Sequence, residues 1–304
     1  MPELPEVNAL AAYLDRALAG LIVERVTIGS VQALKTAVPP YTALVGRTVA
    51  SVGRRGKFLV LETVPGPAPS AHDGEADGGP RLAVVVHLAL GGWVRVLDHL
   101  PTPASAKGRG YIAARFGFVG DGREAGLDFT EQGTWKRLAL HVVRDPQEVP
   151  GIAALGPEPL DEAFTLDAFR ALLRRRAQIK GVLRDQKAIA GIGNAYSDEI
   201  LHAAKISPFA LASSLDDEAS ERLYRAMRSV LAAAVERAAG LPPEELKDDK
   251  RAGMRVHRRT GEACPVCGDT IREVSFSDSA LQYCPTCQTG GKTLADRRTS
   301  TFLK

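Results

Sequence analysis

The chain has 304 residues and a formal net charge of +3, and 45% of its residues are hydrophobic. This length allows two domains or one domain with appendages, and the hydrophobic content supports a globular protein rather than a disordered chain. No apolar run approaches the roughly 18 to 20 residues of a membrane span, and the N-terminus lacks a secretory signal pattern, so we expect a cytoplasmic protein with no membrane partner. Basic residues outnumber acidic ones from Arg170 onward but not before it, which suits either a polyanion such as nucleic acid or an Arg-rich solvated surface.

The chain begins with the sequence Met-Pro-Glu-Leu-Pro-Glu. If Met1 is removed, Pro2 carries a free secondary amine beside the Glu3 carboxyl, and an α-amino group with a pKa of roughly 8 is partly unprotonated at neutral pH. Such an amine condenses with an aldehyde to a cationic iminium, which is an electron sink. The alternative is that Pro2 and Pro5 only open a helix, with Glu3 and Glu6 at its positive end. Taken alone, this short motif favours the alternative.

Apolar residues at spacings of three and four predict a helix from Leu4 to Leu18 that ends at Gly20. Short β-rich runs separated by Gly and Pro follow it and predict an antiparallel sandwich or barrel. These runs are residues 21–28, 48–52, 58–61, 82–88, 93–97, 111–119 and 138–143. Two stretches rich in Pro and Gly, 65–80 and 98–110, are predicted to be loops within this part.

The second half of the chain is predicted to be helical after a linker near 146–159. Thr165 is a suitable N-cap for the first helix, with Phe164 before it as a staple residue. The predicted helices cover 165–176, 181–190, 195–205 and 216–238, and a second linker covers 241–253. We therefore expect domains at 1–147, 163–250 and 251–304, with a linker at 148–162.

The segment Gly191-Ile192-Gly193-Asn194 joins two of these helices. Its glycines allow a tight turn and close approach of a ligand, and the following helix offers free N–H groups to a phosphate, with Asn194 as a side-chain donor. A glycine C-cap between packed helices is the other interpretation. Lys57 lies in the basic turn GRRGKFLVLE, where it could bind phosphate or lie on a solvated strand edge.

The four cysteines follow the pattern C-x2-C-x16-C-x2-C. Two thiolates from each of two tight turns fill the four positions of a tetrahedral zinc ion and leave none open, so the pattern predicts one structural Zn²⁺. Two disulfides or free thiols are the alternative, which a chain without a secretion signal does not favour. The expected ligands are Cys264, Cys267, Cys284 and Cys287.

Taken in order along the chain, these motifs resemble those of the bifunctional DNA glycosylases of the formamidopyrimidine-DNA glycosylase and endonuclease VIII family. The segments that carry the resemblance are PELPEV, GRRGKFLVLE, HLALGGWVR, LGPEPL, DQKAIAGIGNAYSDEIL and the cysteine pattern. The resemblance covers nearly the whole chain. It implies an α+β, multidomain fold with an N-terminal antiparallel β-sandwich flanked by helices, a helix-two-turn-helix domain and a zinc-finger β-hairpin.

The resemblance also implies an enzyme of base-excision repair that acts on damaged DNA as a monomer in the cytoplasm, on the nucleoid. Pro2 would attack C1′ of the damaged nucleotide, Glu3 would carry protons, and Lys57 would contact a phosphate beside the lesion. Asn194 and the N–H of Gly193 would bind backbone phosphate without reading sequence. The damaged nucleotide would be flipped out of the duplex into a cleft between the two domains.

The chain departs from the family in the residues expected to replace the flipped base and in the finger. Leu90 and Trp135 are the candidate apolar wedges, and Trp135 could equally be a core aromatic of the sandwich. The stretch 277–283, before the third cysteine, contains no arginine. Either another cation such as Arg272 replaces it or the reaction stops at β-elimination.

The segment HRRTGEAC is more similar to the endonuclease VIII branch than to the oxidised-purine enzymes. We therefore expect activity on oxidised pyrimidines and abasic sites. The alternatives are an oxidised-purine glycosylase and a damaged-DNA-binding protein with little turnover.

Overall fold

The structure is a computed structural model that describes residues 1–66, 79–102, 112–132, 136–276 and 279–295. The chain forms two compact units, one of Met1–Ala154 with Ala238–Lys247 and the other of Leu155–Arg237 with Asp248–Lys304. Most of the predicted loops at 65–80 and 98–110 lie outside the described residues. In the part of the chain that the structure describes, no helix combines the length and apolar character that crossing a bilayer requires.

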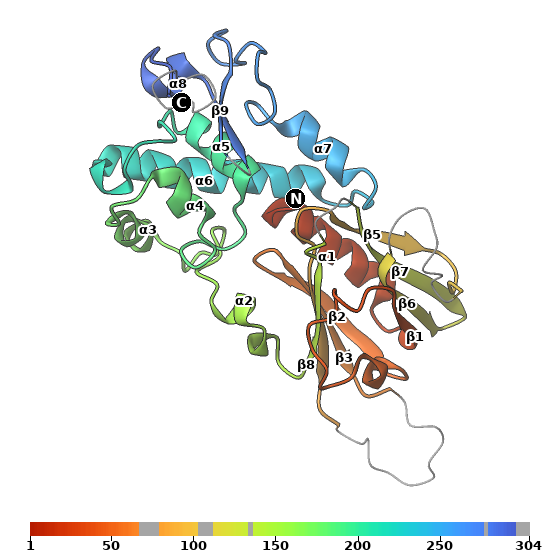
Figure 1. Cartoon of the computed structure of the whole chain (residues 1–304). Coiled ribbons are helices and arrows are strands. Elements are labelled where there is room, and N and C mark those ends of the chain that lie inside the picture. The colour runs from red at the N-terminus through yellow and green to blue at the C-terminus, as the bar shows by residue number, and fades with distance from the viewer. Residues whose placement is uncertain (67–78, 103–111, 133–135, 277–278, 296–304) are drawn as a thin grey trace, which may run out of the picture. The chain divides into compact units, whose positions relative to one another are not determined.

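The first unit contains an antiparallel sheet of eight strands in the order β5-β7-β6-β1-β2-β3-β4-β8 (Figure 1). Its two four-stranded halves join at a single residue pair, Ile22 with Thr48, and both halves contribute to one apolar core. The sheet is therefore folded into the predicted sandwich. The strands are β1 (Ile22–Ile28), β2 (Thr48–Arg55), β3 (Phe58–Val64), β4 (Leu82–His87), β5 (Gly92–Leu97), β6 (Ile112–Gly120), β7 (Arg123–Glu131) and β8 (Ala139–Val143).

Helix α1 (Leu4–Leu18) has the predicted bounds and packs against β2 and β3. Its apolar face is fully buried in the core that it shares with the sheet. The Asp15 carboxylate accepts a hydrogen bond of 2.7 Å from the Val52 backbone N–H, which fixes the helix against β2. The chain leaves the helix through Gly20, whose φ of +83° favours glycine.

Strand β7 was not predicted, because its sequence REAGLDFTE is charged and contains glycine. It forms between β5 and β6 around Asp128, whose neighbours across the strands are Arg95 and Arg115. Both arginines bind the buried carboxylate, at 2.5 and 2.6 Å. Burial alone would raise the pKa of Asp128, but the hydrogen bonds from Arg115 and Arg95 outweigh it and lower the pKa below its usual value.

The second unit has a helical core around α3 (Leu166–Leu173), α4 (Ile179–Arg184), α5 (Asn194–Ala203) and α6 (Asp217–Ala238). The predicted start of α3 is confirmed, since the Thr165 hydroxyl accepts from the Ala168 N–H and Phe164 contacts Phe169 edge-on at 6.2 Å. The prediction for α4 was wrong at its end. The helix ends at Arg184, and residues 185–193 form turns.

Residues 241–253, predicted to be a linker, include helix α7 (Leu246–Gly253). Leu246 is the one buried residue of α7 among those described, so the sequence shows no apolar periodicity there. An ion pair of 2.9 Å joins Asp249 to Arg237 of α6, and an exposed pair of 3.1 Å joins Asp248 and Arg251 within α7 itself.

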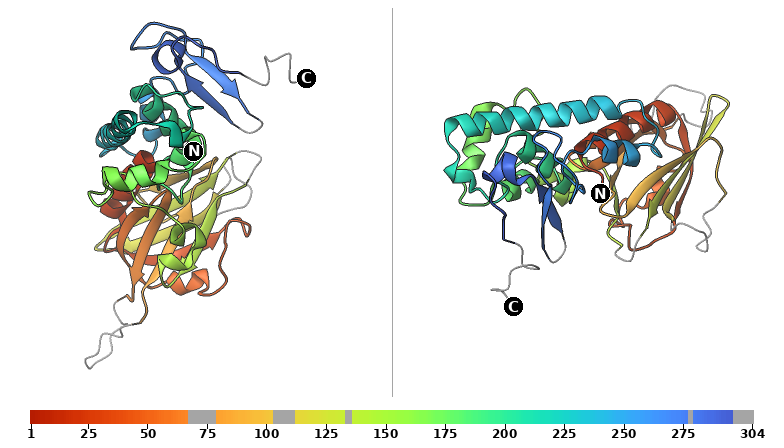
Figure 2. Two further views of the ribbon diagram at one scale, coloured as in Figure 1. Left: turned by 90° about the vertical axis from the view of Figure 1, so that its left-hand side faces the viewer. Right: turned by 90° about the horizontal axis from the view of Figure 1, so that it is seen from above.

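The remaining elements of the first unit are short: η1 (Tyr41–Leu44), η2 (Pro146–Glu148) and α2 (Pro150–Ala153). In the second unit, η3 (Ala212–Ser214) precedes α6, and residues 255–295, called the finger below, follow α7. The finger contains a separate two-stranded sheet of β9 (Arg272–Ser275) and β10 (Ala280–Tyr283), drawn in blue in Figure 2, and the short helix α8 (Pro285–Thr289).

Candidate functional site

The N-terminal residues are held by the start of α1. Glu3 is the N-cap residue and is 2% exposed, and its backbone N–H donates a hydrogen bond of 2.8 Å to the Glu6 carboxylate. The Glu3 and Glu6 side chains form a reciprocal capping box, and Pro5 occupies the first turn. The helix-opening role therefore belongs to Pro5. Pro2 is buried and precedes the N-cap, outside the helix.

Lys57 lies in the turn between β2 and β3 and is 6% exposed. Gly56, with a φ of +53°, makes this turn possible, and the Arg54 guanidinium donates to the Gly56 carbonyl at 2.9 Å. The alternative of a solvated strand edge is wrong for Lys57, because an amine there would be exposed. It holds for the neighbouring Arg55, which is exposed.

His87 is the last residue of β4. It is paired with Phe58 on β3, and the two rings are 4.8 Å apart. Burial, reinforced by the positive charge of Lys57, lowers the pKa of His87 to about 4. The imidazole is therefore neutral at physiological pH.

Leu90 lies at the tip of the loop between β4 and β5 and is 65% exposed. The two glycines after it are required by space, because a Cβ at Gly91 would lie 2.1 Å from the Gln132 carbonyl oxygen and one at Gly92 would lie 2.0 Å from that of Leu88. This tight loop presents Leu90 to solvent, as a wedge requires. Trp135, the second predicted wedge, lies outside the described residues.

In the second unit, Gln186 shapes the turn that leads to α5. Its amide donates to the Ile192 carbonyl at 2.7 Å and accepts from the Gly191 N–H at 3.0 Å. Gly191 has a φ of +87°, and Gly193 is the N-cap of α5. Sequence reasoning did not single out Gln186, because a polar residue in a turn gives no sign of which backbone groups it binds.

Asn194 is the first residue of α5, at the positive end of the helix. Its amide nitrogen donates a hydrogen bond of 2.7 Å to the carbonyl of Ala280, the first residue of β10. The predicted phosphate donor is thus also a link between this turn and the finger hairpin.

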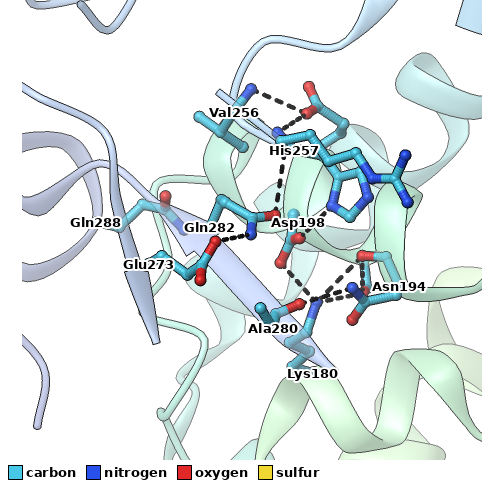
Figure 3. A network of polar contacts seen from close by, with 12 residues as sticks. Lys180, Asn194, Asp198, Val256, His257, Glu273, Ala280, Gln282 and Gln288 are labelled. Atoms are coloured by element: carbon cyan, nitrogen blue, oxygen red, sulfur yellow. Dashed lines mark hydrogen bonds and ion pairs between the residues drawn. The ribbon is translucent and has the colours of Figure 1, made fainter. Parts of the chain in front are cut away.

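A buried polar network lies behind Asn194 (Figure 3). The Lys180 ammonium donates to the Asn194 carbonyl at 3.2 Å, to the Ser197 hydroxyl at 2.8 Å and to the Asp198 carboxylate at 2.5 Å. The other carboxylate oxygen of Asp198 is 2.8 Å from Nδ1 of His257, at the start of the finger.

The next residue of α5, Glu199, binds the finger through its backbone. Its carboxylate accepts from three successive N–H groups, those of Arg255, Val256 and His257, at 2.8, 3.0 and 2.8 Å. Burial raises the pKa of Glu199 even though these N–H groups favour the ionised form. Asp198 and Glu199 are adjacent in sequence and both point to the finger.

The four cysteines come together at one point of the finger. All are free of disulfides, and their Sγ atoms lie within 4.8 Å of one another. Across the two turns, Cys264 and Cys287 are 3.9 Å apart and Cys267 and Cys284 are 3.3 Å apart. Thiolates that bind one zinc ion at about 2.3 Å are separated by about 3.8 Å in a tetrahedron. The cluster therefore fits one structural Zn²⁺ with all four positions filled, as predicted.

His202 on α5 lies against this cluster. Its Nε2 is 3.3 Å from Cys264 Sγ, and the side chain is 2% exposed. Asp198 and His202 are one helical turn apart, so one face of α5 carries several of the contacts to the finger. The sequence analysis did not single out Asp198, Glu199 or His202, because it showed them only as three polar residues within one predicted helix.

The finger hairpin presents an aromatic ring at its turn. Phe276 follows β9 and is 42% exposed, and its N–H donates to the Ser279 carbonyl at 2.7 Å. Arg272, at the other end of β9, is exposed. Arg272 is the cation of this hairpin among its described residues.

Both units match protein families that are already known. Residues 1–135 match the formamidopyrimidine-DNA glycosylase N-terminal domain, residues 155–242 the H2TH domain of the same enzymes, and residues 261–290 the zinc finger found in FPG and IleRS. The solved structure of MutM in complex with DNA containing carbocyclic 8-oxo-G has a TM-score of 0.78 at 25% identity, covering 95% of this chain and 100% of that one. Lactococcus lactis Fpg bound to DNA with an oxidised pyrimidine has a TM-score of 0.79, with the same identity and coverage.

Among curated proteins, an uncharacterised formamidopyrimidine-DNA glycosylase-like protein of Mycobacterium tuberculosis is 59% identical over 155 residues, covering 51% of this chain and 98% of that protein. The formamidopyrimidine-DNA glycosylase of Parafrankia sp. is 35% identical, covering 95% of this chain and 98% of that enzyme. That of Thermus thermophilus is 34% identical, covering 96% and 100%. With its three matching domains in this order, the chain belongs to the formamidopyrimidine-DNA glycosylase family and is a DNA glycosylase of base-excision repair.

Proposed function

We propose that the chain removes oxidised bases through a covalent intermediate on Pro2 and then cleaves the abasic site. The observation that carries the proposal is the position of Pro2, which is buried next to the N-cap Glu3 and outside α1. A residue that only opened the helix would lie in its first turn, as Pro5 does. Once Met1 is removed, the secondary amine of Pro2 lies directly before the N-cap Glu3, where it is a candidate nucleophile.

The proposed reaction begins when the Pro2 nitrogen attacks C1′ and the bond from C1′ to the damaged base breaks, with the base leaving as it takes up a proton. Glu3 protonates the ring oxygen of the sugar so that the ring opens to a cationic iminium. Loss of a C2′ proton then feeds electrons into the iminium, and the bond from C3′ to its phosphate oxygen breaks. Water hydrolyses the remaining conjugated iminium, which releases the unsaturated aldehyde and returns free Pro2.

Lys57 is proposed to hold a phosphate beside the lesion and to stabilise it as it leaves. Its burial supports this role, because a cation in a site with little water interacts strongly with an anion. His87 is neutral and adds no competing positive charge. In the second unit, Gly193 and Asn194 at the start of α5 are proposed to bind backbone phosphate, which positions the DNA without reading its sequence.

We further propose that the reaction ends at β-elimination and that oxidised pyrimidines and abasic sites are the preferred substrates. The absence of arginine from 277–283 supports the first point, and the segment HRRTGEAC supports the second. The second candidate function, a damaged-DNA-binding protein with little turnover, is favoured by that same missing arginine. An oxidised-purine glycosylase is the alternative within the enzyme class.

Borohydride trapping on DNA with an abasic site tests the Pro2 mechanism. Reduction of the iminium should give a covalent adduct with the mature protein, a much weaker one with Pro2→Gly and none with protein that retains Met1, as checked by N-terminal mass. Pro5→Ala is the matched control, since it changes the other proline of the segment and should still be trapped. An undiminished adduct from Pro2→Gly, or none from the mature wild type, would refute the proposal.

A panel of lesion-bearing oligonucleotides tests substrate and product. Faster excision of oxidised pyrimidines than of 8-oxoguanine, with a 3′ unsaturated aldehyde as the end product, is the expected result. A 3′ phosphate would show that a second elimination occurs and that another cation replaces the missing arginine. Tight binding of the panel without excision would establish the binding protein instead.

A further inference from the structure

Helix α5 connects the turn at its N-terminus with the segment that enters the finger. Asp198, which is 1% exposed, is the residue shared by the two sides. One of its carboxylate oxygens binds Lys180, and the other binds Nδ1 of His257 (Figure 3). Lys180 in turn reaches the Asn194 carbonyl.

Each member of this chain of contacts depends on the next. Lys180 is 6% exposed, so its charge requires the Asp198 carboxylate. A buried carboxylate also needs donors on both oxygens to offset its lost hydration. His257 supplies the donor on the finger side, with a side chain that is 14% exposed.

We propose that His257 is a positioning residue for the phosphate-binding turn at Asn194 and that it acts through Asp198 and Lys180. The inference rests on the proposed role of this turn in binding DNA. Without the His257 hydrogen bond, one oxygen of Asp198 loses its donor, and the carboxylate turns toward other donors. Lys180 follows the carboxylate and releases the Asn194 carbonyl, so the first N–H groups of α5 lose their alignment on the phosphate.

A second hydrogen bond links the finger to the turn at Asn194. The Asn194 amide binds the Ala280 carbonyl of β10, while His257 secures the entry to the finger. The finger therefore contacts the Lys180 network at both of its ends, at the Asn194 amide and at His257. Binding of phosphate by the turn and placement of the hairpin are coupled by this geometry.

Three variants at one position separate positioning from direct contact with DNA. His257→Phe keeps the ring and removes both nitrogens. In His257→Asn the amide nitrogen occupies roughly the place of Nδ1 and can still donate to Asp198. In His257→Gln it reaches roughly the place of Nε2, which faces away from Asp198.

Fluorescence anisotropy with a short duplex that contains a tetrahydrofuran abasic analogue measures the effect. Loss of a hydrogen bond to a charged group predicts about tenfold weaker binding by His257→Phe. His257→Asn should bind within about twofold of the wild type, and His257→Gln should be as weak as the phenylalanine variant. Rescue by Gln instead of Asn would show that His257 touches DNA through Nε2 and would overturn the proposal, as would wild-type affinity of His257→Phe.

A double-mutant cycle with Asp198→Asn tests the route of action. If His257 acts through Asp198, the double variant should bind no more weakly than Asp198→Asn alone, whereas additive losses would contradict that route. His141→Phe, the same change on β8 of the first unit, is the matched control. Zinc content and the unfolding midpoint are measured for every variant, and the Asn and Gln variants are compared directly because both are polar and flexible.

The borohydride trapping assay distinguishes failure of this inference from failure of the proposed Pro2 mechanism. Failure of the wild type to form an adduct would refute the Pro2 mechanism and leave the affinity comparison intact. Normal trapping with unchanged affinity across the His257 variants would refute the positioning role alone.

Discussion

His87 shows how the surroundings of one residue set its chemistry. The sequence places it at the head of HLALGGWVR, and the structure places it where burial and the charge of Lys57 act together. Its pKa of about 4 in the folded protein is well below the ordinary value of 6.5. The unfolded chain therefore takes up a proton at a higher pH than the folded protein does.

This difference predicts a loss of stability in mild acid. Above pH 6.5 the imidazole is neutral in both states, and its full contribution is present. As the pH falls from 6.5 toward 4, the unfolded state is protonated first, so at pH 5 this group alone lowers the free energy of unfolding by about 2 kcal/mol. Urea unfolding of the wild type and of His87→Gln at pH 7.5 and pH 5 measures it. An equal drop in both proteins would contradict the assigned cause.

Among the helices, strands and turns, the sequence predicted those that have an apolar periodicity, a capping residue or a cysteine spacing of their own. Helix α1, the Thr165 cap and the cysteine turns have local signals, and the structure confirms them. Strand β7 and helix α7 have none. The first depends on Asp128 meeting arginines 13 and 33 residues away, and the second on one buried leucine and ion pairs.

The candidate site divides in the same way. Local motifs predicted Lys57, Asn194 and the zinc ligands as candidates, because each lies in a turn or a spacing with its own signature. The partners that hold them come from distant parts of the chain. Gln186, Asp198 and His202 showed only as polar residues in helices and turns until the fold identified what they bind.

Asp128 provides the test of β7. Asp128→Asn keeps the size of the side chain and removes the charge that both arginines share, which leaves two cations facing each other across the strand. Breaking a buried ion pair in this way should lower the free energy of unfolding of the first unit by about 3 kcal/mol. Denaturant titration measures it, with Asp167→Asn as the control, because that carboxylate is 92% exposed and lies 3.6 Å from Arg170. Similar small losses in both variants would show that β7 does not depend on the charge.

At the scale of the whole molecule, stability comes from two different sources. The first unit and the helical core each bury a large apolar cluster, whereas the finger has two small clusters and a metal site. A segment of that size cannot fold on its apolar core alone, so zinc supplies the missing free energy. The finger should therefore respond to metal while the first unit does not.

Cys284→Ser tests this division. Loss of one thiolate should unfold the finger and lower the affinity for DNA at least tenfold, since zinc binding is worth on the order of 10 kcal/mol to such segments. The apolar core of the first unit should unfold at the wild-type denaturant concentration. Val266→Ala, an exposed position in the other cysteine turn, is the control and should change neither property. Wild-type DNA binding by Cys284→Ser would refute the role of the metal.

The Glu199 contact has a consequence for how this protein can change over time. Its carboxylate binds three backbone N–H groups, and every amino acid except proline provides such a group. The exposed side chain at 255 can therefore vary without loosening this contact, provided that it does not become proline, whereas Val256 is also constrained by its burial in the finger. For these three hydrogen bonds the required identity is that of Glu199 on α5, so a substitution there removes all three contacts at once.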